Sequence, residues 1–147
     1  MENILEINNL QKNYSDFSLK DFSFSLEPGM IMGFIGPNGA GKSTTIKLIM
    51  NLIKKDAGEI KVFGKDHLKH EREIKEKTGF VYDENHFYEE LTLKDMRKII
   101  APFYKNWDED EFQKHIKKFK LPLNKKIKEL SKGMKMKYSL ALALSHH

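Results

Sequence analysis

The sequence predicts an α/β protein, and three observations lead to this fold class. Two segments near the N-terminus alternate apolar and polar side chains, as half-buried strands do. A glycine-rich loop then joins an apolar run to a segment with helical periodicity. After residue 83, apolar residues recur at the three- and four-residue spacing of helices. We therefore expect a strand-rich unit at 1–82 and a helical unit at 83–147.

The expected strands come first along the chain. The segments "ILEINNL" (4–10) and "FSLKDFSFSLE" (17–27) are predicted to pair as antiparallel strands. The sequence "EPG" then makes a turn into "MIMGFIG" (30–36), which is almost wholly apolar. That composition is typical of a strand covered on both faces. Short strands are also expected within "KKDAGEIKVFGKD" (54–66) and at "GFVY" (79–82).

The expected helices follow the glycine-rich loop. Residues 42–53 are predicted to form a helix with an apolar face made of Ile46, Ile49, Met50 and Ile53. A charged helix is expected at 68–77, and a last helix begins near Gly133.

Two further helices are expected between the charged helix and the last helix, and each begins with a capping signal. Thr92 with Asp95, and Asp108 with Glu111, have the three-residue spacing of a capping box. The apolar stripes that follow are Leu93, Met96, Ile100 and Phe103 in the first helix and Phe112, Ile116 and Phe119 in the second.

Composition excludes several classes of protein. The chain has 147 residues, no cysteine and a net charge of +5. Disulfides and thiolate metal sites are therefore excluded, and no apolar run reaches the roughly 18 residues of a membrane span. We see no signal peptide in the first ten residues. Arg72 and Arg97 are the only arginines, and the lysines are interspersed with glutamates, so nucleic acid is not expected as a partner.

The glycine-rich loop carries the chemistry. It fits the pattern G-x-x-x-x-G-K-[ST] through Gly36, Pro37, Asn38, Gly39, Ala40, Gly41, Lys42 and Ser43, with a further hydroxyl at Thr44. Glycines let successive backbone N–H groups converge on an anion, and the helix that follows adds its positive N-terminal end. Lys42 would bind the terminal phosphates of a nucleoside triphosphate such as ATP, and the Ser43 hydroxyl would ligate Mg²⁺.

Two further stretches narrow the class. "LSKGM" comprises Leu130, Ser131, Lys132, Gly133 and Met134 and leads into the last helix. Tyr14 lies upstream of the phosphate-binding loop in "LQKNY". In this order the motifs resemble those of ATP-binding cassette (ABC) proteins, whose signature usually reads L-S-G-G-Q. The resemblance covers nearly the whole chain, and segments such as "YDENHFYEELTLKD" look most like small bacterial exporters of the ABC-2 type.

This resemblance implies a function. ABC cassettes combine an antiparallel β subdomain and a helical subdomain, and two of them bind nucleotides head to tail. Tyr14 would stack on adenine, Lys42 would act in catalysis, and the signature loop would contact the partner subunit's nucleotide. A separate transmembrane permease subunit would complete a transporter, with this subunit cytoplasmic, at the inner face of the cell membrane. The helices from Thr92 to Phe103 would face that permease.

The sequence also departs from the family pattern. Asp83 stands where the family usually has a glutamine that reaches Mg²⁺, and a carboxylate could ligate the metal there; a solvated acidic loop is the alternative. Lys132 and Met134 replace the usual glycine and glutamine of the signature.

The family's Asp-Glu strand and switch histidine would follow the last helix, and His146 and His147 come too early to be that switch. We therefore expect an N-terminal part of a longer protein that lacks the C-terminal part of the core and binds ATP without useful hydrolysis. In the family, strands of that missing part lie beside the segment 30–36, so we expect this segment to keep unpaired edges and uncovered apolar surface, and the chain to self-associate.

Two alternatives remain open from the sequence. The chain could belong to a soluble ABC-type ATPase that acts on ribosomes or DNA, although no coiled-coil heptads lie between Thr45 and Glu129. A small-molecule kinase would share the phosphate-binding loop, but the signature-like loop counts against it. The transported substrate, the direction of transport and the composition of the dimer are not encoded in recognisable motifs.

Overall fold

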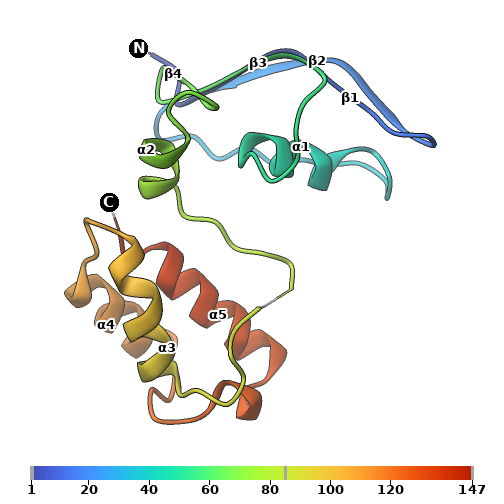
Figure 1. The fold of residues 1–147 in the computed structure, drawn as a ribbon. Helices are drawn as coiled ribbons and strands as arrows, with labels where there is room; N and C mark the ends of the chain where they lie inside the picture. The colour runs from blue at the N-terminus through green and yellow to red at the C-terminus, as the bar shows by residue number, and fades with distance from the viewer. Residues whose placement is uncertain (1, 85, 147) are drawn as a thin grey trace. The chain divides into compact units, whose positions relative to one another are not determined.

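The computed structural model of the chain describes residues 2–84 and 86–146. It divides into two compact units, residues 1–74 and 75–147. The sequence placed a subdomain boundary at residue 82, and that division stays a prediction. The elements in chain order are β1 (Leu5–Asn13), β2 (Ser18–Leu26), α1 (Lys42–Ile49), β3 (Ala57–Val62), β4 (Lys65–Asp66), α2 (Glu71–Glu76), α3 (Leu93–Ile100), α4 (Glu109–Lys118) and α5 (Lys132–Ala143), with 3₁₀ turns at Ala101–Phe103 and Ile127–Glu129 (Figure 1).

An antiparallel sheet forms the first unit. Its strands lie in the order β2-β1-β3-β4, and β1 pairs with both β2 and β3, which confirms the predicted antiparallel strands. Alternate residues of these strands point to one face and pack against Leu48 of α1 and Ile74 of α2. The buried core of this unit consists of Ile7, Leu10, Leu19, Leu48, Ile60, Val62 and Ile74. Figure 1 shows α1 lying along this sheet.

The predicted strand at residues 30–36 is wrong for this chain. The segment runs without strand pairing, and the side chains of Ile31 and Ile35 are 100% and 98% exposed. A central strand needs partners on its edges, and the four strands among the described residues all pair elsewhere. The strand prediction is therefore wrong, whereas the expectation that the apolar surface of this segment stays uncovered is confirmed.

Helix α1 is shorter than predicted, and the predicted apolar face is only partly buried: Ile49 and Ile53 pack against the core. The helix ends at Ile49, and the turn that follows places Asn51 at a φ of 50°. Thr45 and Leu48 are buried, whereas Ile46 is 38% exposed. The predicted face therefore points only partly toward the sheet, because the sheet covers one side of the helix and leaves the Ile46 side uncovered.

Three helices make the core of the second unit. Leu93 and Met96 of α3, Phe112 and Ile116 of α4, and Tyr138, Ala141 and Leu142 of α5 are all buried in one cluster. The predicted caps are confirmed. The Thr92 hydroxyl accepts a hydrogen bond from the Asp95 N–H at 3.1 Å, and the Asp108 carboxylate accepts one from the Glu111 N–H at 2.9 Å.

Two details of the second unit differ from the prediction. Phe103 does not continue the apolar stripe of α3, because the chain tightens into a 3₁₀ turn at Ala101–Phe103 and leaves Phe103 76% exposed. Residues 79–82 are not a strand. Gly79 instead lies so close to the backbone of Ala143 that an added Cβ would come within 2.5 Å of its carbonyl oxygen.

Candidate functional site

The glycine-rich loop turns directly into α1. Gly39 and Gly41 adopt φ values of 84° and 88°, in the left-handed region that glycine tolerates. Gly41 is the N-cap residue of α1, and no side chain caps this helix end. The first N–H groups of α1 are therefore open to an anion, and the helix dipole favours negative charge there.

Lys42 lies folded over this loop. Its ammonium group donates hydrogen bonds to the carbonyl oxygens of Gly36 at 2.6 Å and Pro37 at 2.7 Å. These bonds hold the positive charge at the mouth of the loop, where an anion bound by the backbone N–H groups would lie. The hydroxyl-bearing Ser43 is exposed beside it. Together they offer a cation and a hard oxygen ligand on one helix end.

A hollow of about 300 Å³ joins this loop to the β1–β2 hairpin. It brings together seven of the predicted site residues, namely Tyr14, Asn38, Gly39, Gly41, Lys42, Ser43 and Thr44. Gly36 and Pro37 contribute through their bonds to Lys42, and Ala40 N–H donates to the Pro37 carbonyl at 3.2 Å. The hollow thus has a polar end at the loop and an aromatic end at the hairpin.

Phe17 also lines this hollow, and the sequence analysis missed it. Its ring centroid lies 6.5 Å from that of Tyr14, with the two planes tilted by 32°. Its carbonyl accepts a hydrogen bond from the Tyr14 N–H at 2.7 Å, which closes the hairpin turn between them. The signal in the sequence was an aromatic residue three positions after Tyr14, at the entry of the second predicted strand.

The signature-like loop lies in the second unit, at the start of α5. The Ser131 hydroxyl caps α5 by accepting a hydrogen bond from the Met134 N–H at 3.2 Å. Leu130 is buried in the helical core and Met134 packs against it. Lys132 and Gly133 are exposed. The loop is therefore anchored by its apolar ends and presents its middle residues to solvent.

Asp83 lies in the same unit as the signature-like loop. It is exposed, and its carboxylate accepts a hydrogen bond from the Glu84 N–H at 3.0 Å. Together with Leu130, Lys132 and Lys135, these two acidic residues line a shallow hollow of about 250 Å³. Asp83 and Ser43 belong to different units, so a shared Mg²⁺ site stays a prediction. The described residues contain no cluster of three or more His, Asp or Glu side chains that could hold a metal alone.

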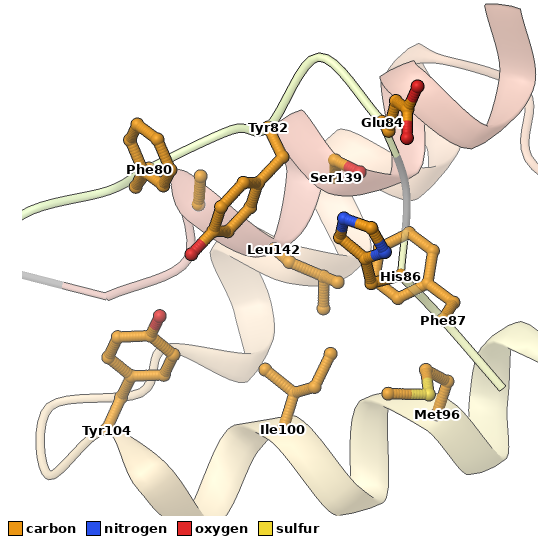
Figure 2. A pocket seen from close by; sticks show the side chains of 11 residues that line it. Phe80, Tyr82, Glu84, His86, Phe87, Met96, Ile100, Tyr104, Ser139 and Leu142 are labelled. Carbon is orange, nitrogen blue, oxygen red and sulfur yellow. The ribbon is translucent and has the colours of Figure 1, made fainter. Parts of the chain in front are cut away.

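A second pocket, of about 230 Å³, lies within the helical unit. Figure 2 shows Met96 and Ile100 of α3 facing Leu142 of α5. Phe80 and Tyr82, on the segment that precedes α3, lie beside them. Tyr104 also lines the pocket. Burial raises the pKa of its hydroxyl. The remaining lining residues are Glu84, His86, Phe87, Ser139 and Ala143. Its interior is aromatic and aliphatic, and its charged group is Glu84.

His146 is part of this unit's packing. Its ring stacks on Tyr104 with centroids 3.8 Å apart, and it is 6% exposed. His147 lies outside the described residues. The described helices are all too short or too polar to cross a lipid bilayer.

An α/β fold with a glycine-rich phosphate-binding loop that leads into a helix is typical of a class of nucleotide-binding proteins. Comparison with known proteins identifies the family within that class. The pattern of the ABC transporter family matches residues 19–147. The chain therefore belongs to the ABC transporter family, whose ATP-binding subunits it resembles throughout.

Individual relatives agree with this assignment. The chain is 34% identical to the ABC transporter ATP-binding protein YtrB of Bacillus subtilis over 127 residues, which are 86% of this chain and 43% of the relative. It is 33% identical to the bacitracin transport ATP-binding protein BcrA of Bacillus licheniformis over 152 aligned positions, covering 100% of this chain and 49% of the relative. The chain thus spans about half the length of the curated relatives it matches.

Comparison with solved structures gives the same family. The solved structure of an ATP-binding subunit of an ABC transporter superposes with a TM-score of 0.83 at 30% identity, over 95% of this chain and 60% of that one. The predicted fold class, an ABC-type cassette shorter than the full domain, is confirmed. The relatives named here are transporter proteins, and nothing in these matches supports a role on ribosomes or DNA.

Proposed function

We propose that this chain is the nucleotide-binding part of the ATP-binding subunit of an ABC transporter and that it binds ATP with Mg²⁺ at the loop of residues 36–44. The supporting observation is the hollow in which the loop, the N-terminus of α1 and Tyr14 meet. The phosphates would take the backbone N–H groups and Lys42, and the base would stack on Tyr14. Mg²⁺ would be held by Ser43 and phosphate oxygens, because this ion usually takes few protein ligands.

The decisive test is the affinity for Mg-ATP, measured by isothermal titration calorimetry. Lys42→Ala should weaken binding by about 100-fold or more, since it removes the cation beside the terminal phosphates. Lys47→Ala is the matched control, because Lys47 is an exposed lysine in the last turn of the same helix. Unchanged affinity in Lys42→Ala, or an equal loss in both variants, would refute this site.

Hydrolysis is proposed to need a general base in addition to the phosphate-binding loop, because the attacking water must be activated. The described residues that line the hollow include no carboxylate and no histidine, so the hollow itself supplies no such base. We therefore expect this hollow to bind ATP while hydrolysing it far more slowly than a complete ABC ATPase does.

Two partners are proposed. The exposed Ser131, Lys132 and Gly133 would close on the nucleotide of a second ATPase subunit, in a head-to-tail dimer. Asp83 would take the place of the family's metal-reaching glutamine. A transmembrane subunit would dock on the helical unit, where the pocket between α3 and α5 offers apolar walls to a side chain of the partner (Figure 2). These partners would place the protein at the cytoplasmic face of the membrane.

A further inference from the structure

The conformation of Gly41 is central to the phosphate-binding loop, because this residue is where the loop becomes helix α1. Its φ of 88° aims the following N–H groups of the helix end. A backbone in this region is accessible to glycine but not uniquely preferred by it, since glycine has many other accessible conformations. Something other than the glycine itself must therefore hold the loop in the shape that receives phosphate.

The helix supplies one restraint on Gly41. The Gly41 carbonyl accepts hydrogen bonds from both the N–H of Thr45 at 2.8 Å and the Thr45 hydroxyl at 2.9 Å. Thr45 is 2% exposed, so both bonds are shielded from water. These bonds fix the carbonyl side of Gly41 but leave its Cα side free to move.

Phe17 supplies a second restraint on Gly41. A Cβ added to Gly41 would meet the Cζ atom of Phe17 at 2.9 Å and the Cδ1 atom of Leu19 at 3.5 Å. The tip of the phenyl ring therefore lies directly against the Gly41 Cα, in the space that any other residue's side chain would need. Gly41 is held between the ring of Phe17 and the hydroxyl of Thr45.

The position of Phe17 is itself fixed by the end of the β1–β2 hairpin. The Tyr14 N–H bonds to the Phe17 carbonyl at 2.7 Å, next to the last strand pair, Asn13 with Ser18. Asp56 anchors the same hairpin end, since its carboxylate accepts bonds from the Asn13 N–H at 2.7 Å and from the Lys12 ammonium at 2.9 Å. The ring is therefore presented to the loop by a hydrogen-bonded turn.

We propose that Phe17 is a positioning residue of the nucleotide site, which braces Gly41 so that the loop keeps its phosphate-binding shape. This inference rests on the proposed function and deepens it. Phe17 acts through the loop and hence on the triphosphate, whereas the role proposed for Tyr14 is a contact with the base. The two aromatic residues of the hollow therefore have separable effects.

The test compares two ligands in the full chain, Mg-ATP and magnesium tripolyphosphate, which has no base. Phe17→Leu removes the Cζ atom that touches Gly41 while keeping an apolar side chain. It should weaken the binding of both ligands by a similar factor, about tenfold for a loss of loop pre-organisation. Tyr14→Ala should weaken only Mg-ATP. Phe17→Met, whose unbranched chain can reach Gly41 again, should restore most of the tripolyphosphate affinity.

The control is Leu5→Ala, a truncation at the far end of β1 that packs on the same core cluster but does not line the hollow. It should leave both affinities unchanged while lowering stability. Tripolyphosphate binding that is unchanged in Phe17→Leu, or is lost equally in Leu5→Ala, would overturn the brace. If the unmutated chain binds neither ligand, the phosphate site itself is wrong, which is a different outcome from failure of the brace alone.

Discussion

The two units of this molecule differ in how well they cover their apolar side chains. In the helical unit, residues 75–147, the long apolar side chains Phe112 and Tyr138 are 0% exposed. In the sheet unit, residues 1–74, the apolar segment 30–36 is largely exposed, with Ile31 at 100%. The helical unit thus has a complete core of its own, whereas the sheet unit leaves a contiguous apolar segment uncovered.

The difference follows from how helices and strands satisfy the hydrogen bonds of their backbone groups. A helix closes its hydrogen bonds within itself and needs neighbours only for its apolar stripe. A strand must find both its hydrogen-bond partners and the cover for its faces elsewhere in the chain. Residues 30–36 have the composition of a strand covered on both faces, but they pair with none of the strands β1 to β4. The uncovered segment is the expected origin of self-association, which stays a prediction.

The largest expected effect comes from a pair of truncations, one in each unit. Phe112→Ala should cost about 3–5 kcal/mol, because it opens a cavity in a closed core. Ile35→Ala should cost close to zero, since Ile35 is 98% exposed. Urea unfolding would measure the first through Trp107, the only tryptophan, whose ring lies 5.4 Å from that of Phe112. Hydrogen exchange of the strands β1 and β3 would report on the second.

A loss of more than about 1 kcal/mol in the free energy of unfolding for Ile35→Ala would contradict the proposed difference between the two units. Such a cost is typical of a side chain that is buried on folding. It would show that the segment 30–36 is covered in solution, by a second copy of the chain for example. Light scattering on the same samples would then distinguish a covered monomer from an associated one.

A medium effect is expected at the centre of the helical unit. The Tyr138 hydroxyl donates a hydrogen bond to the Leu93 carbonyl at 2.7 Å, and burial raises the pKa of this phenol. Tyr138→Phe leaves that carbonyl without its side-chain donor, which should cost about 1–3 kcal/mol. Replacing Tyr88, which is 67% exposed, by Phe is the control and should be neutral. Equal stability of the two variants would mean that the hydrogen bond to Leu93 adds nothing to the closed core.

Sequence patterns predicted the helical unit better than the sheet unit, for the same physical reason. The caps at Thr92 and Asp108 and the buried stripes after them are local signals, and the structure confirmed them. The position of Phe103 failed because a 3₁₀ turn interrupts the helix. In the sheet unit the alternating strands were found, but residues 30–36 do not form the predicted strand, because strand formation depends on pairing that no local pattern encodes.

The residues of the candidate site also differ in how well the sequence predicted them. The loop motif predicted its own residues, because glycine and lysine spacing is a local signature. Phe17 was not predicted, since its contact with Gly41 joins a hairpin turn to a loop more than twenty residues later. The pocket between α3 and α5 was also missed, because its walls come from three separate segments of the chain.

The smallest expected effect concerns Asp56, which ties the hairpin end of the sheet unit together. The Asn13 N–H, followed by the Lys12 ammonium, holds the pKa of this carboxyl below its usual value of 3.8. Since the folded-state pKa is lower than the unfolded one, the unfolded chain binds more protons in the acid range. The stabilisation is fully present above the unfolded pKa and is lost as the pH falls through the folded pKa.

Asp56→Asn should therefore lower stability slightly at neutral pH and flatten the loss of stability of the sheet unit on acidification below about pH 4. The effect should be small, because the carboxylate is solvent-accessible and its ion pair is screened. Hydrogen exchange of β1 and β3 between pH 3 and 7, with matched urea unfolding curves, would measure it, and Asp16→Asn at the tip of the same hairpin controls for the change in charge. If Asp56→Asn changes the acid dependence of the sheet unit alone, the two units unfold independently. An identical change in the Trp107 signal of the helical unit would show that the two units unfold together.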